Sequence, residues 1–282
     1  MDLTVGSQAF SPTARLLWCL RWMVTVQCAG YAAQLAGPSS LNSWLLEPLG
    51  DSFVSGLDAW ATACLWTSLV AVPLLGVIRP IGTTGRPWAF RCDLTLLGLV
   101  VSWALTEAFF SWWSNMGNPF RGTDPFGHAV RYVAPFVLLV LWSGWGRHVR
   151  TEWILRLAVA ATFVGHGLCS WWLQPEFIDL IVGTMDTFLG DDWEAAGARQ
   201  VFAEDALPWI AMQDFVLAGL LVLPGRRLRW LVLWMSIWGF ITALSRITAF
   251  GLERWPDFCL RICNGGIPLL LWMHWRNLLR KS

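Results

Sequence analysis

Polar side chains that could do chemistry stand inside long apolar stretches of this sequence. His166 is flanked by Gly165 and Gly167, and these glycines leave room for another backbone or for a flat ligand. An imidazole can accept a proton or hydrogen-bond a ligand near neutral pH, so His166 is a candidate ligand-binding residue. The simpler interpretation is a neutral His166 that is hydrogen-bonded across a helix interface.

Three charged residues also interrupt apolar stretches, namely Glu107, Asp214 and Arg246. A charge at the centre of a bilayer costs about 2.5–3.5 kcal/mol on insertion scales, so such side chains are expected to face protein or water. We therefore expect Glu107 and Arg246 to face an inner cavity, where they could pair, with Asp214 and His166 nearby. A structural ion pair with snorkelling side chains is the alternative.

Other chemistries are less well supported. Cys259 and Cys263 lie four residues apart and could be redox thiols, although cysteines in such stretches more often pack as small residues. Four scattered histidines predict no metal site, and an axial haem pair of His128 and His166 is not favoured. Stacked indoles in a cavity would suit a quinone or a pigment ring, so the sequence leaves the cofactor unknown, with a quinone as a candidate. The only lysine, Lys281, is in the C-terminal tail, which excludes a retinal Schiff base between helices.

Membrane-spanning helices must position these residues, because the chain is 56% hydrophobic and only 14% charged. Residues 153–172 are long enough to cross a hydrocarbon core of ~30 Å. The eight predicted spans are residues 16–35, 59–78, 94–113, 130–145, 153–172, 206–223, 228–250 and 262–275. Residues 174–205 are expected to form a connector in which 177–189 lie as a short interfacial helix.

The charges alternate in sign from one predicted connector to the next. Basic residues gather at both ends of the chain and in the even-numbered connectors, whereas acidic residues gather in the odd-numbered ones. The positive-inside rule then predicts that both termini are cytoplasmic. No cleavable signal peptide is evident at the N-terminus, and nothing in this composition suggests nucleic-acid binding.

The two halves of the chain resemble each other. Residues 20–31 align with residues 155–166 at a constant offset, and the same offset superposes Arg91 on Arg226 and Trp103 on Trp238. The fold class predicted is therefore an all-α integral membrane protein built from two tandem four-helix units, residues 1–150 and 151–282. Two units with an even number of spans share one orientation in the membrane.

Several motifs of the second unit occur together in a known family. They are Leu155-Arg156-Leu157, Phe163-Val164-Gly165-His166-Gly167, Phe177-Ile178-Asp179-Leu180, and the stretches 219–225 and 261–269. With them, residues 153–275 resemble the DoxX/DoxD family of four-helix membrane proteins, whereas the first unit departs from it because Tyr31 stands where His166 would be. The resemblance implies a multi-pass protein of the bacterial cytoplasmic (inner) membrane, sometimes associated with quinone, thiosulfate or thiol redox systems.

The sequence and the resemblance together predict the membrane subunit of a quinone- or thiol-linked redox system. Its ring ligand is expected between the two units, near His166, Glu107, Asp214 and Arg246. Two alternatives remain: a non-catalytic accessory or assembly subunit of a larger membrane complex, and a small-solute transporter. The expected partners are the lipid bilayer and other membrane-complex subunits, not nucleic acid.

Overall fold

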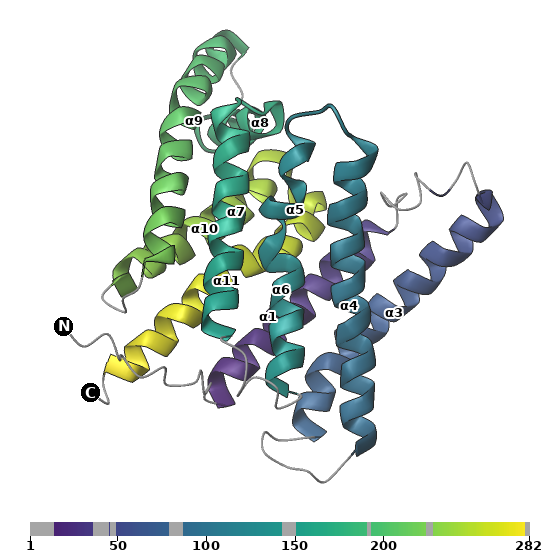
Figure 1. The fold of residues 1–282 in the computed structure, drawn as a ribbon. Helices are drawn as coiled ribbons and strands as arrows, with labels where there is room; N and C mark the ends of the chain where they lie inside the picture. Colours follow the sequence, from purple (N-terminus) through teal and green to yellow (C-terminus); the bar gives the residue numbers. More distant parts are fainter. Residues whose placement is uncertain are drawn as a thin grey trace.

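A computed structural model describes residues 14–35, 45, 49–78, 87–142, 151–190, 193–223 and 228–279 of the protein. These residues are helical throughout, with no strand among them (Figure 1). The long helices are α1 (Ala14–Gln34), α3 (Asp51–Ile78), α4 (Pro87–Ser114), α6 (Ala129–Trp142), α7 (Thr151–Trp171), α9 (Trp193–Val222), α10 (Arg229–Phe250) and α11 (Trp255–Leu279). The short ones are η1 (Arg121–Thr123), α5 (Asp124–Gly127), α8 (Pro175–Leu189) and η4 (Leu252–Arg254). Each predicted span overlaps one long helix.

Several helices are longer than the apolar stretches that predicted them. The largest difference is in α9, which begins at Trp193, whereas residues up to 205 were assigned to a connector. Likewise α4 begins at Pro87 and includes Asp93, which was expected to lie before the span. Acidic residues are tolerated near helix N-termini by the helix dipole, and Asp93 is paired with Arg21. Hydropathy therefore marks the lipid-facing part of a helix and not its ends.

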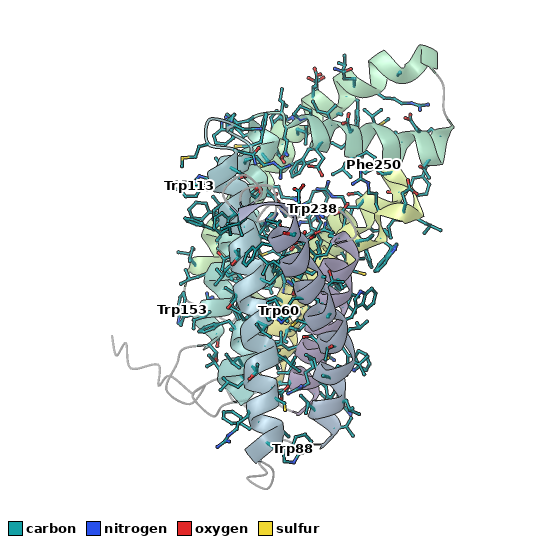
Figure 2. All side chains as sticks on the ribbon, turned by 90° about the vertical axis from the view of Figure 1, so that its right-hand side faces the viewer. Trp60, Trp88, Trp113, Trp153, Trp238 and Phe250 are labelled. Atoms are coloured by element: carbon teal, nitrogen blue, oxygen red, sulfur yellow. The ribbon has the colours of Figure 1, made fainter. Side chains whose placement is uncertain are left out.

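Five described helices are long and apolar enough to cross a membrane, which is compatible with a membrane protein. They cover Asp51–Val77, Trp88–Ser114, Thr151–Trp171, Ala196–Val222 and Arg229–Phe250. Figure 2 shows Trp88 and Trp113 at opposite ends of α4, and both indoles are exposed. These residues are about 37 Å apart along the helix, the spacing expected of aromatic anchors at two membrane interfaces.

The helices pack in the same order in both halves of the chain. In the first half α1 packs on α3 and α4 on α6; in the second half α7 packs on α9 and α10 on α11. The halves meet where α1 packs on α11 and α6 on α7 (Figure 1). Helices α1, α6 and α11 therefore lie in the middle of the bundle, and their polar side chains can face protein instead of lipid.

Two buried arginines occupy equivalent places in the two halves. Arg21 of α1 donates to the carbonyl oxygen of Val72, close to the end of α3. Arg156 of α7 donates to the carbonyl oxygen of Leu221, close to the end of α9, at 2.7 and 2.9 Å. The Leu221 carbonyl is in the last turn of α9, so Arg156 satisfies a group that has no partner within the helix and complements the helix dipole. The Val72 carbonyl lies further inside its helix, since α3 continues to Ile78.

Candidate functional site

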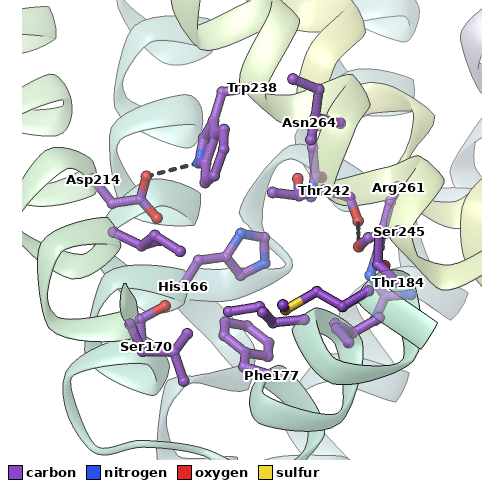
Figure 3. A pocket seen from close by; sticks show the side chains of 16 residues that line it. His166, Ser170, Phe177, Thr184, Asp214, Trp238, Thr242, Ser245, Arg261 and Asn264 are labelled. Carbon is purple, nitrogen blue, oxygen red and sulfur yellow. Dashed lines mark hydrogen bonds between the residues drawn. The ribbon is translucent and has the colours of Figure 1, made fainter. Parts of the chain in front are cut away.

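A cavity of about 260 Å³ lies within the second half of the chain, between α7, α8, α9, α10 and α11 (Figure 3). Most of its wall is apolar. The polar residues that line it are His166, Ser170, Thr184, Asp214, Trp238, Thr242, Ser245, Arg261 and Asn264. Its size is slightly below the ~300 Å³ at which pockets for drug-sized ligands begin, which is suitable for a small ring.

His166 is held at the cavity by the glycines on either side of it. A Cβ atom on Gly165 would lie 2.5 Å from the backbone nitrogen of Gly127 in α5, so α7 and α5 touch through their backbones. A Cβ atom on Gly167 would lie 2.7 Å from the ring of Phe215 in α9. The glycines thus leave room for neighbouring segments, and the imidazole between them projects into the cavity (Figure 3).

Asp214 lines the same cavity from α9. Its Oδ1 accepts a hydrogen bond of 3.1 Å from the indole Nε1 of Trp238 in α10. Asp214 is only 3% exposed, and no cation pairs with it among the described residues. Of the four predicted site residues, His166 and Asp214 are brought together here.

Helix α8 covers one side of the cavity. Phe177, in its first turn, lies edge-on to the His166 ring with centroids 6.1 Å apart. Gly183 permits close packing on α10, since a Cβ atom there would lie 2.7 Å from the carbonyl oxygen of Ala249. The sequence predicted a short interfacial helix at these residues; its apolar face covers a protein cavity.

Two polar side chains at the cavity have no hydrogen-bond partner among the described residues. They are Ser170, through its Oγ, and Asn264, through both amide atoms, and each is at least 98% buried. A buried polar group without a partner costs roughly 1–3 kcal/mol, so native proteins rarely keep one without a role. Sequence reasoning did not select either residue, although Asn264 interrupts an apolar stretch and was part of the family motif.

Glu107 and Arg246 are not among the residues that line the cavity. Arg246 forms an ion pair with Glu176 at the start of α8, so the suggested pair with Glu107 is not the one formed. Glu107 belongs to α4 in the other half and lies within electrostatic range of Tyr31. The cavity lies inside the second half and not between the two halves, where the ring ligand was expected. Helix α8, which was expected to lie at the membrane interface, forms one of its walls.

The remaining candidates lie elsewhere. Cys263 is fully buried and donates to Oε1 of Gln27 at 3.3 Å, while Cys259 is partly exposed on the same helix. His128 does not line the cavity, and burial, reinforced by Arg131 and Arg261, holds its pKa well below 6.5. The described residues contain no group of three or more His, Cys, Asp or Glu side chains placed to hold a metal ion.

A second cavity, of about 230 Å³, lies between α3 and α4 in the first half. It is lined by Trp103, the residue that aligns with Trp238, and its other lining residues are apolar or carry only hydroxyl or thiol groups. No charged residue lines it, whereas His166, Asp214 and Arg261 line the cavity in the second half. The polar site is therefore a property of the second half.

Compared with known proteins, the chain matches no family model, no curated protein and no solved structure. The resemblance to the DoxX/DoxD family stays a prediction. What the protein does must be argued from the cavity.

Proposed function

We propose that this protein binds a quinone-class ring in the cavity of its second half and serves as the membrane subunit of a quinone-linked redox system. The observation that carries the proposal is the pair of unpartnered side chains, Ser170 and Asn264, in a largely apolar cavity. Both can donate hydrogen bonds. Figure 3 places them on opposite sides of His166, which suits a flat ring with a carbonyl group at each end.

The walls of the cavity are also suited to a ring. Phe177 and Trp238 offer aromatic surfaces on two different helices. Rings attract one another in edge-on or offset arrangements, which contributes about 0.5–1.5 kcal/mol beyond the buried area. Asp214 and His166 are groups that can exchange a proton with a quinone oxygen.

Access from the bilayer supports a lipophilic ligand. Helices α9 and α10 contact each other little, although both line the cavity. Ile241 of α10 lines the cavity and is also 49% exposed, so the cavity wall reaches the surface at this residue. A ring with an apolar tail could enter between α9 and α10 without crossing water.

We further propose that all eight long helices cross the bacterial inner membrane as two tandem units, with both chain ends on the cytoplasmic side. Helices α1 and α11, which are not among the five apolar helices, lie in the middle of the bundle, where polar side chains need not meet lipid. Helix α6 is apolar, but its described part has only 14 residues. Arg21 and Arg156, which align between the halves and both donate to a backbone carbonyl group of a neighbouring helix, support the duplication. The thiol-linked alternative is less favoured, because Cys263 is buried and engaged with Gln27.

The experiment is calorimetric titration of the naphthoquinone menadione into the protein in lipid nanodiscs. Asn264→Leu should weaken binding about tenfold or more, because the buried amide is the ring's hydrogen-bond partner. The same substitution should leave thermal stability equal or higher, since it removes an unsatisfied polar group. Ser68→Ala, in the cavity of the first half, is the matched control for Ser170→Ala. The proposal would be refuted if the wild type did not bind menadione, or if Asn264→Leu and Ser170→Ala both bound it as tightly as the wild type.

A further inference from the structure

The cavity is electrically polarised from one end to the other. Arg261 and Asn264 are three residues apart on α11 and so share one face of that helix. Asp214 stands at the opposite end, with Trp238 and His166 between it and Arg261 (Figure 3). Asp214 is the only carboxylate that lines the cavity within the described part of the chain.

The charge of Arg261 is only partly compensated. Its Nη1 lies 3.6 Å from a carboxylate oxygen of Asp257 and donates to the backbone carbonyl of the same residue at 3.1 Å. The Asp257 carboxylate is shared. Arg254 lies 3.4 Å from its Oδ2, and Gln34 donates at 2.8 Å to Oδ1, the oxygen that Arg261 also contacts. The Nε of Arg261 has no hydrogen-bond partner among the described residues. One carboxylate therefore serves two guanidinium groups.

Two further guanidinium groups, those of Arg131 and Arg246, lie within electrostatic range of Arg261 but do not line the cavity. Arg261, Arg131 and Arg246 are the charged residues that act electrostatically on His166. Arg246 is compensated by Glu176. Arg131 is 94% buried, and its Nε and Nη2 have no hydrogen-bond partner among the described residues. An incompletely compensated positive charge in a cavity wall, in surroundings of low dielectric, attracts an anion.

We infer that the ring bound in this cavity carries an acidic hydroxyl, ionised at neutral pH, that faces Arg261 and Asn264. The inference rests on the proposed function and names the class of ring more closely: a hydroxyquinone anion. A guanidinium donates strong, charge-assisted hydrogen bonds to such an oxygen, and the Asn264 amide supplies another donor. The neutral edge of the ring then faces the side of the cavity that holds Ser170 and Asp214.

The test compares three rings in the same nanodisc titration at neutral pH. They are lawsone, a naphthoquinone with an ionised ring hydroxyl, its methyl ether, which has nearly the same size but cannot ionise, and menadione. Lawsone should bind about tenfold more tightly than its methyl ether, because a hydrogen bond to a charged group is stronger than a neutral one. Arg261→Gln should remove this preference while neutral rings still bind. Arg254 also contacts Asp257 but is not part of the cavity wall, so Arg254→Gln should keep the preference for lawsone.

The outcomes separate the two proposals. If no ring binds, both the quinone function and this inference are wrong. If the neutral rings bind but lawsone is not preferred, or if its preference survives Arg261→Gln, only the inference is overturned. Arg261→Lys, which keeps the charge but loses the forked geometry, should retain part of the preference. Loss of all ring binding in Arg261→Gln with unchanged thermal stability would also contradict the inference, because the neutral rings do not depend on this charge.

Discussion

The side chain of Gln27 in α1 donates a hydrogen bond of 2.6 Å to the backbone carbonyl of Arg131 in α6. This carbonyl would normally accept from the residue four positions later, but that residue is Pro135, which has no N–H group. At its other end, Gln27 accepts a hydrogen bond from Cys263 of α11. The fully buried Gln27 amide thus links the three central helices. It also supplies the hydrogen-bond donor that Pro135 cannot provide to the Arg131 carbonyl.

Gln27→Leu should therefore destabilise the fold by about 1–3 kcal/mol, because it leaves a buried carbonyl without a donor. The measurement is denaturant unfolding in detergent micelles. Pro135→Ala restores an N–H group that can reach the Arg131 carbonyl, so Gln27→Leu should cost about 1 kcal/mol less in that background. Equal costs in the two backgrounds would show that the two residues do not act on the same carbonyl.

Gly165→Ala should destabilise the protein by about 1–3 kcal/mol and weaken menadione binding, because the added methyl group meets the backbone of α5 and displaces His166. Thermal unfolding and calorimetry measure the two effects. Gly219 in α9 is the matched control, since no atom lies within 4 Å of a Cβ placed there. Gly219→Ala should leave stability equal or up to about 1 kcal/mol higher. Unchanged stability in Gly165→Ala would contradict the close approach.

Acidification should destabilise the protein in part through His128. Burial, followed by the charges of Arg131, Arg261, His166 and Arg121, holds its folded-state pKa well below the ordinary 6.5. The unfolded chain then binds the proton first, so the contribution of His128 to stability is present above pH 6.5 and is lost as the pH falls. His128→Gln should flatten the decline in unfolding free energy between about pH 7 and pH 5.

Asp124 provides the contrast to His128. Burial raises its pKa above 3.8, against the opposing hydrogen bond from Ser111, so its contribution is lost as the pH rises through the folded-state value. Asp124→Asn should therefore change the pH profile in the opposite direction: without this carboxyl group, the unfolding free energy should fall more steeply as the pH is lowered. An unchanged profile in His128→Gln would mean that other groups cause the acid sensitivity.

Local sequence patterns predicted much of the fold. Apolar stretches marked all eight long helices, because a helix surrounded by lipid or by other apolar helices must itself be largely apolar. The apolar stretches did not predict where helices begin and end. The first part of α9, Trp193–Asp205, contains several acidic residues and was assigned to a connector, because hydropathy does not report backbone hydrogen bonding. The helix at Phe177 was also expected, but its position over a cavity was not.

The sequence by itself determined which positions were unusual: His166 between two glycines, and Asp214 and Arg246 in apolar surroundings, all recognisable because a polar group in such a stretch needs a partner. Only the tertiary structure decided the partners. It joins Asp214 to Trp238 and Arg246 to Glu176, and it leaves Asn264 facing the cavity. These relationships depend on how helices distant in the sequence pack against each other, and no pattern within a single helix specifies that packing.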